Sequence, residues 1–160
     1  MEIERKFLIG KIPFELGDYV CRKIEQAYLC TEPVVRVRRD NGDFYLTYKS
    51  KGLMVREEYN LPLTEEAYSH LLAKHDGIII TKKRYEIPEK DGLTIELDVF
   101  EGEYDGLILA EVEFNSEEQA IAYTPPEWFG KDVSSSPEYH NSTLSCGLSK
   151  DTIMRQKKAQ

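Results

Sequence analysis

The sequence predicts a mainly β (α+β) fold, in which eight antiparallel strands close into a barrel with a charged lumen and a few helices pack outside. Eight segments show the alternation of apolar and polar residues that is typical of strands. Short turn sequences such as Asn41-Gly42 and Asp91-Gly92 join several of them, which indicates antiparallel neighbours. The polar positions are almost all ionisable, and we expect such a sheet to close on itself, because a barrel leaves no exposed strand edge.

The strand-like segments cover residues 2–9, 22–30, 33–40, 43–51, 55–62, 79–88, 92–101 and 107–114. A helix is predicted over residues 64–75, because Thr64 is a suitable cap and Glu65 and Glu66 suit the first turn. A second helix begins with the capping-box sequence of residues 116–119 and ends before Pro125. A third is expected from Ser136 to about residue 147. We expect residues 1–148 to form one domain and residues 149–160 to be a loosely ordered tail.

The charge balance excludes some classes of partner. The chain of 160 residues has a net charge of −8. Nucleic acids and acidic membranes are held mainly by an excess of Lys and Arg, so neither is expected as a partner. An RNA-binding barrel would also need aromatic residues interleaved with a basic surface. Any polyanion that this protein binds must therefore meet a local basic cluster.

The cysteines and histidines show no metal-binding pattern. Cys21, Cys30 and Cys146 form no CxxC motif and are odd in number, so we expect reduced, buried thiols rather than zinc ligands or disulfides. The three histidines have no ligand or triad spacing. No signal peptide is evident, and no apolar run approaches the roughly 20 residues that a membrane span requires. These features predict a cytoplasmic protein.

The charged residues of each strand share one face, because successive side chains of a strand point to opposite faces. Glu2, Glu4 and Lys6 show the pattern at the start of the chain. Over the whole sequence the acidic members are Glu2, Glu4, Glu58, Glu96, Asp98, Glu111 and Glu113, and the basic members are Lys6, Arg36, Arg38, Lys49, Arg56, Lys82 and Arg84.

Two interpretations of this face compete. In the first, the sheet shows its charged face to water, and ion pairs contribute only a few tenths of a kcal/mol each. In the second, the face lines a lumen, where charges are costly to desolvate unless they neutralise one another or bind ions. Carboxylates gathered without His or Cys suit Mg²⁺ or Mn²⁺, and clustered Arg and Lys suit phosphate oxygens. The second interpretation predicts a site for a metal-bound polyphosphate.

An ordered set of motifs carries a family resemblance. The set comprises Glu2-x-Glu4-x-Lys6, Arg36-x-Arg38, Thr47-x-Lys49, Arg56-x-Glu58, Lys82-x-Arg84, Glu96-x-Asp98 and Glu111-x-Glu113. It resembles the CYTH family, or triphosphate tunnel metalloenzymes, and is most similar to the small bacterial inorganic tripolyphosphatases. The resemblance implies an eight-stranded tunnel that binds a triphosphate with divalent metal, expected here as two Mg²⁺ or Mn²⁺ ions per site with substrate bound.

The resemblance also implies roles for residues. Glu2, Glu4, Glu111 and Glu113 correspond to the main metal carboxylates, Glu96 and Asp98 to ligands of a second metal or its waters, and Glu58 to a lesser candidate. Lys6, Arg36, Arg38, Lys49, Arg56, Lys82 and Arg84 correspond to the phosphate-binding set. Lys82 and Tyr28 correspond to a catalytic pair near the attacked phosphorus. Residues 130–134 resemble the segment before a helix at one tunnel mouth, although Asp132 and Ser134 depart from the usual Glu and Thr.

The expected activity is metal-dependent hydrolysis of a linear triphosphate, inorganic tripolyphosphate above all, to diphosphate and phosphate. No aromatic or amide cluster is evident for holding an organic base, which favours the inorganic substrate over thiamine triphosphate or the ATP of a class IV adenylyl cyclase. A different class of function, a non-catalytic sensor of polyphosphate or nucleotide, would be expected to lack metal carboxylates, and none is missing. The expected oligomeric state is a monomer or a homodimer.

Overall fold

The computed structural model describes residues 3–51, 57–147 and 150–158 of the chain. Its sheet is antiparallel throughout, in the order β5-β4-β3-β2-β6-β7-β8-β1-β9. The strands are β1 (Glu4–Ile9), β2 (Val20–Thr31), β3 (Val34–Asp40), β4 (Asp43–Lys49), β5 (Glu58–Pro62), β6 (Asp76–Pro88), β7 (Thr94–Glu101), β8 (Ile108–Glu113) and β9 (Phe129–Asp132). The sequence analysis predicted the first eight of these and missed β9.

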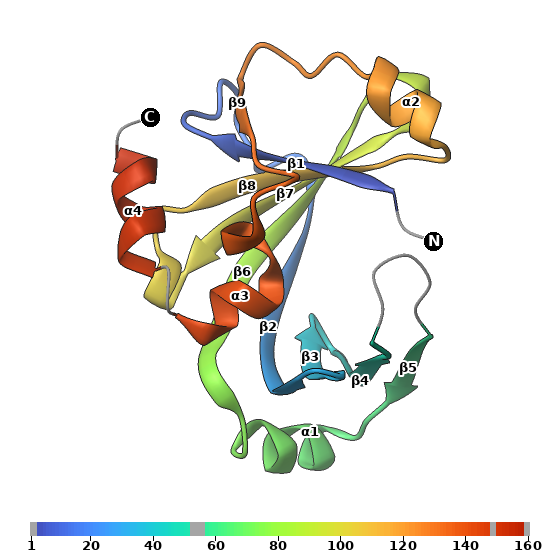
Figure 1. Cartoon of the computed structure of the whole chain (residues 1–160), viewed down its shortest axis with the longest axis vertical. Coiled ribbons are helices and arrows are strands. Elements are labelled where there is room, and N and C mark those ends of the chain that lie inside the picture. The colour runs from blue at the N-terminus through green and yellow to red at the C-terminus, as the bar shows by residue number, and fades with distance from the viewer. Residues whose placement is uncertain (1–2, 52–56, 148–149, 159–160) are drawn as a thin grey trace.

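The predicted closure of the barrel is not found in the described sheet. The sheet curves strongly, so that β3, β4 and β5 lie across a concave space from β1 (Figure 1). No hydrogen-bonded ladder joins the two ends within the described residues, and β5 and β9 are the edges. At one end of the sheet β9 pairs with β1 at Phe7 and Ile9, while β8 pairs with the other edge of β1, so this stretch of β1 has no free edge for β5.

Within the described residues four helices accompany the sheet: α1 (Glu65–Leu72), α2 (Glu117–Ala122), α3 (Asn141–Cys146) and α4 (Lys150–Lys158). Two predicted caps are present, since Thr64 Oγ1 accepts from Ala67 N at 3.1 Å and Ser116 Oγ accepts from Gln119 N at 3.1 Å. Helix α4 occupies the segment that we expected to be a loose tail, and its Ile153 is buried. No helix in the described ranges is long and apolar enough to cross a membrane.

The part of the chain that the structure describes also contains three single turns of 3-10 helix: η1 (Lys90–Gly92), η2 (Gly102–Tyr104) and η3 (Pro137–Tyr139). The last of these and α3 share the segment that was predicted to be one helix.

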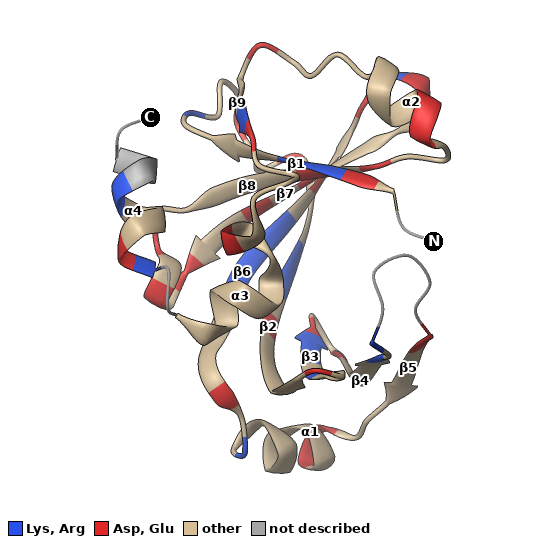
Figure 2. Ribbon diagram, viewed as in Figure 1, with Lys and Arg blue, Asp and Glu red and all other residues tan. Residues whose placement is uncertain are grey.

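The core lies on both faces of the strands around β8. On the convex face, Phe7, Leu97 and Val112 pack with residues near α2. On the concave face, Leu8 and Leu109 pack against residues near α3 and α4. The remaining concave face keeps the charged positions, and Figure 2 shows basic segments along β2, β3 and β6. Apolar packing therefore fills one end of the concave space and leaves the charged end open.

The cysteines are not buried as predicted. Cys21 and Cys146 are exposed and Cys30 is half-buried, and all three are free thiols. The prediction was wrong because both exposed positions lie outside the two apolar clusters, Cys21 near the start of β2 and Cys146 at the end of α3.

Candidate functional site

A charged cavity of about 450 Å³ lies on the concave face. Its lining comes from β1, from β3 through β8, and from α3. The predicted site residues in the lining are Glu4, Arg36, Arg38, Lys49, Glu58, Arg84, Glu96, Glu111 and Glu113. A larger depression of about 760 Å³, lined by residues such as Phe14 and Trp128, contains none of the predicted residues. The smaller, charged cavity is therefore the candidate site.

Strand register brings these side chains together. Lys6 is the Cα partner of Glu111, which is in turn the partner of Glu96 on the next strand. Cross-strand partners point to the same face of a sheet, so the three side chains form a row. Asp98 is likewise the partner of Arg84. The alternation read from the sequence therefore assigns these charges to one face correctly.

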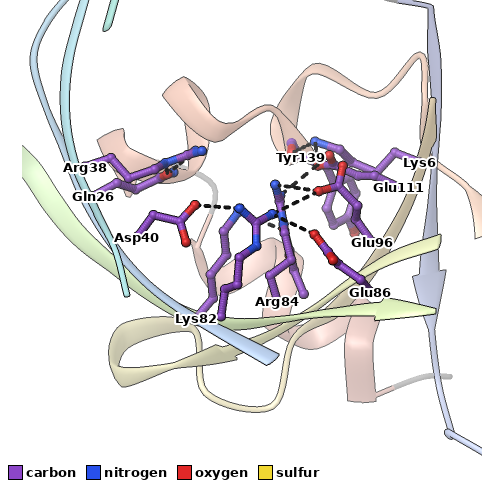
Figure 3. Close-up of polar contacts among 12 residues, drawn as sticks. Lys6, Gln26, Arg38, Asp40, Lys82, Arg84, Glu86, Glu96, Glu111 and Tyr139 are labelled. Carbon is purple, nitrogen blue, oxygen red and sulfur yellow. Dashed lines mark hydrogen bonds and ion pairs between the residues drawn. The ribbon is translucent and has the colours of Figure 1, made fainter. Parts of the chain in front are cut away.

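One wall of the site consists of ion pairs. Lys82 Nζ lies 2.8 Å from Asp98 Oδ2, and Arg84 donates to both oxygens of Asp98, at 2.7 and 2.8 Å. Arg84 also lies 3.1 Å from Glu96 and 3.8 Å from Glu111. Figure 3 shows Arg84 reaching towards Glu96 and Glu111. The carboxylates of this wall neutralise its cations.

Lys6 extends the same row of ion pairs on β1. Its Nζ lies 3.2 Å from Glu111 and donates to the Tyr139 carbonyl at 3.0 Å. Figure 3 shows Lys6 beside both of these residues.

Burial and charge shift the pKa values of this wall. Burial alone would raise the pKa of Asp98, but Lys82 and Arg84 hold it well below its usual range. Burial lowers the pKa of Lys82 to about 8, against the opposing pull of Asp98. Burial also raises the pKa of Glu96. Burial would likewise raise the pKa of Glu111, but Lys6, Arg84 and Lys82 together lower it. At neutral pH the Lys82–Asp98 pair is therefore charged on both sides.

The arginines on the wall formed by β3 have hydrogen-bond partners of a different kind. Arg38 donates from Nε to Gln26 Oε1 at 2.8 Å and from Nη1 to the Tyr45 hydroxyl at 3.4 Å. Arg36 donates from Nη2 to Thr47 Oγ1 at 3.1 Å. These acceptors are uncharged, so both guanidinium groups keep their positive charge towards the cavity. Such groups suit the oxygens of a phosphate.

The predicted pair of Lys82 and Tyr28 is not in contact. Lys82 is the partner of Ile24 on β2, and Tyr28 lies four residues further along that strand, a displacement of about 13 Å. Both side chains are buried, and neither belongs to the residues that line the cavity. Asp98 is also buried, beneath Arg84. The predicted Glu2 and Arg56 lie outside the described residues.

The donor set suits a hard cation. Glu4 and Glu113 are Cα partners, and so are Glu96 and Glu111, which places like charges directly opposite each other. Arg84 and Lys6 already compensate Glu96 and Glu111, and carboxylate oxygens are the ligands that Mg²⁺ and Mn²⁺ prefer. No three Asp, Glu, His or Cys side chains of the described ranges converge closely enough to form a complete ligand set. The chemistry of the donors thus fits a divalent cation.

Several polar residues of the site were missed by the sequence analysis. Tyr45, Asn60 and Asn141 line the cavity. Arg22 Nη1 lies 2.7 Å from Asp40 on β3, and its Nη2 lies 3.4 Å from Glu96 on β7. For Asp40 the signal was available, because it continues the charged parity of Arg36 and Arg38 by two residues, whereas Arg22 is separated from the polar positions of β2 by Ile24. Asn141 belongs to the Tyr139-x-Asn141 motif, which resembles the family's helix near one tunnel mouth, but it was not among the predicted site residues; packing of α3 on the sheet brings it to the cavity.

Comparisons with known proteins agree with this geometry. Residues 1–144 match the CYTH domain model. The chain is 36% identical to an inorganic triphosphatase of Nitrosomonas europaea, over 92% of this chain and 98% of the relative. It is also 36% identical to an inorganic triphosphatase of Acetivibrio thermocellus, over 89% of this chain and 92% of the relative.

The chain is also similar to solved structures. The crystal structure of the inorganic triphosphatase NE1496 is similar with a TM-score of 0.74 at 35% identity, covering 91% of this chain and 95% of that one. The Hippeastrum protein HpAC1 has a TM-score of 0.52 at 15% identity, covering 76% of this chain and 83% of that one, a likeness of fold alone. With the family match over residues 1–144 and relatives at 36% identity, the chain belongs to the CYTH family.

Proposed function

We propose that this protein hydrolyses inorganic triphosphate to diphosphate and phosphate, with Mg²⁺ or Mn²⁺ as the required metal. The observation that carries the proposal is the composition of one cavity, whose lining combines carboxylates on β1 and β8 with arginines on β3 that have uncharged partners. A metal-bound triphosphate needs both kinds of group. The names of the two relatives at 36% identity support the same substrate.

In the proposed reaction, water attacks a terminal phosphorus, the bond to the bridging oxygen breaks, and diphosphate leaves. Arg36, Arg38 and Lys49 hold phosphate oxygens of the substrate through charge-assisted hydrogen bonds. Glu4, Glu111 and Glu113, with Glu2, would hold the metal. When bound, a divalent metal neutralises phosphate oxygens and acidifies water. Catalysis is then largely a matter of positioning and charge.

The contacts of Lys82 suggest how it contributes. Since Lys82 is buried against Asp98, and Asp98 holds Arg84, we propose that Lys82 keeps Arg84 in place at the cavity. The role of Tyr28 stays a prediction from the resemblance. Two metal ions, second-metal roles for Glu96, Asp98 and Glu58, and phosphate contacts of Lys6 and Arg56 likewise remain part of the proposal.

We also propose a single domain over residues 1–148, with Ile153 of α4 packed into its core, in a cytoplasmic protein that acts as a monomer or homodimer, without nucleic-acid or membrane partners. The net charge of −8 supports the last point. Light scattering coupled to size-exclusion chromatography measures the oligomeric state directly.

A substrate panel tests the activity. The protein is incubated with Mg²⁺ or Mn²⁺ and, separately, with tripolyphosphate, thiamine triphosphate, ATP and long-chain polyphosphate, and the release of phosphate and of cyclic AMP is followed. We expect tripolyphosphate to be hydrolysed fastest. Cyclic AMP as the main product, or no turnover of any substrate, would overturn the proposal.

Carboxylate variants test the site. Glu4→Gln and Glu113→Gln are expected to abolish turnover while the circular dichroism spectrum remains that of the wild type. Glu118→Gln makes the same change on the exposed side of α2 and should keep full activity. Near-normal activity of either cavity variant would show that the metal assignment is wrong.

A further inference from the structure

Five of the described cations in or beside the cavity fall into two groups with different partners. Lys6, Lys82 and Arg84 each form an ion pair with a carboxylate. Arg36 and Arg38 form none with any described residue, and their hydrogen bonds go to a hydroxyl, an amide and a phenol. The two arginines of β3 therefore keep positive charge for an anion.

Gln26 is the main partner of Arg38. Its side chain is fully buried on β2, directly opposite Arg38 in the ladder. Its Oε1 accepts from Nε of Arg38 at 2.8 Å and also from Nη2, so one oxygen holds two of the guanidinium nitrogens. Figure 3 shows the two side chains lying along each other on the side of the cavity away from Lys6. This contact determines the direction in which Arg38 points.

The amide of Gln26 has only one workable orientation. A guanidinium group donates and never accepts, so the amide oxygen must face Arg38 and the amide nitrogen must face away. Gln26 Nε2 then has no hydrogen-bond partner in the described part of the chain. A buried donor without a partner is destabilising. The unpaired amide nitrogen of Gln26 therefore lowers the stability of the folded protein, and the presence of an amide at this position needs an explanation.

A glutamate at position 26 would remove the unpaired buried donor but would add a negative charge beside Arg38. It has nearly the same shape, would accept from the same two nitrogens and has no amide group to leave unpaired. However, its carboxylate would neutralise Arg38. Burial and the neighbouring Arg36 already lower the pKa of Arg38, a sign that its charge lacks compensation here. An amide holds the guanidinium in place and leaves that charge for a bound anion.

We infer that Gln26 is a positioning residue for the triphosphate, which orients Arg38 through an uncharged acceptor and so keeps its charge available to a phosphate group. The Thr47 hydroxyl, which accepts from Arg36 and donates to Asn60 Oδ1 at 2.6 Å, is a similar uncharged arrangement for the other arginine of β3. The inference rests on the proposed function, since it concerns the binding of the same substrate.

Gln26→Glu tests the inference. We expect the KM for tripolyphosphate to rise about tenfold while kcat changes less than about threefold, because neutralising Arg38 weakens a charge-assisted contact to the substrate. The Tm should equal or exceed that of the wild type, since the variant gains an ion pair. Gln119→Glu is the matched control: on α2, Gln119 Oε1 accepts from Asn115 N at 2.9 Å, and a glutamate can do the same. It should keep the wild-type KM.

A double-mutant cycle separates positioning from direct contact. In an Arg38→Met background, Gln26→Glu should leave KM unchanged, because the residue acts through Arg38. A further tenfold rise in that background would overturn the inference. If Gln26→Glu does not fold, Gln26→Met replaces it: loss of the acceptor releases Arg38, so KM should rise while kcat is largely kept, and an unchanged KM would overturn the inference.

Activity of the wild-type protein distinguishes a failure of this inference from a failure of the proposed function. If the wild-type protein does not hydrolyse tripolyphosphate, the proposed function fails, and the inference fails with it. If the wild type does hydrolyse it and Gln26→Glu keeps the wild-type KM, only the role of Gln26 is wrong.

Discussion

Lys82 Nζ lies 2.8 Å from Asp98 Oδ2, and the exposed fractions of the two side chains are 0% and 1%. Arg84 donates two further hydrogen bonds to the same carboxylate. One buried carboxylate thus compensates two cations from β6, one of which reaches the cavity. Removing one member of such a group leaves an uncompensated charge in the protein interior, which is more damaging than losing an exposed pair.

Asp98→Asn is therefore expected to lower the free energy of unfolding by about 3 to 5 kcal/mol. Urea denaturation followed by circular dichroism measures the loss. Asp132→Asn is the matched control, because Asp132 pairs with Arg5 at 3.0 Å where both side chains are partly exposed. The control should lose much less stability. Equal losses in the two variants would contradict the assignment of Asp98 as the compensating charge.

The lowered pKa of Lys82 predicts a dependence of stability on pH. The pKa is about 8 in the folded protein and about 10.4 in an unfolded chain, so between these values the unfolded state binds more protons. The contribution of this group to the free energy of unfolding therefore rises with pH across that window, by about 3 kcal/mol at most.

The measurement compares urea denaturation of the wild type and Lys82→Gln at intervals from pH 7.5 to about 10. The free energy of unfolding of the wild type minus that of the variant should increase with pH. A difference that stays flat or shrinks would mean that burial does not depress the pKa of Lys82.

The opposed carboxylates predict a stabilising effect of metal. Glu4 and Glu113 are cross-strand partners, so a divalent cation that binds them relieves their repulsion and favours the folded state. Mg²⁺ or Mn²⁺ should raise the Tm of the wild type in a saturable manner, and a chelator should reverse the rise. In Glu113→Gln the rise should be much smaller, although the Tm without metal should be unchanged or slightly higher. An equal metal response of variant and wild type would place the metal elsewhere.

The contact between β6 and α3 depends on Gly77. Its φ is +68°, and a Cβ there would lie 2.1 Å from the Ser145 carbonyl oxygen. Gly92 has a similar φ of +71° with no atom within 4 Å of a Cβ. Gly92→Ala should therefore lose only the backbone term of about 1 to 2 kcal/mol, whereas Gly77→Ala should lose clearly more. Thermal and urea denaturation of both variants measure the difference, and similar losses would show that α3 moves aside without strain.

Most of the strands could be predicted because their signal is local. The alternation from Ile95 to Asp98, for example, is a property of neighbouring residues and needs no knowledge of the partner strand. Strand β9 could not be found in this way. It has four residues, Phe129–Asp132, and forms only because the chain returns to the edge of β1 near Phe7. That long-range pairing also occupies the edge of β1 beside Phe7 and Ile9.

The same distinction holds for the site. The sequence by itself determined which side chains share the charged face, since alternation along a strand is a consequence of backbone geometry, and its motifs indicated the CYTH family. Only the tertiary structure decided which charges meet. Strand register pairs Arg84 with Asp98 but sets Arg38 against Gln26, and apolar packing buries Lys82 away from the cavity. Register and packing depend on residues far apart in the chain, and these long-range contacts decide which cations remain free for an anion.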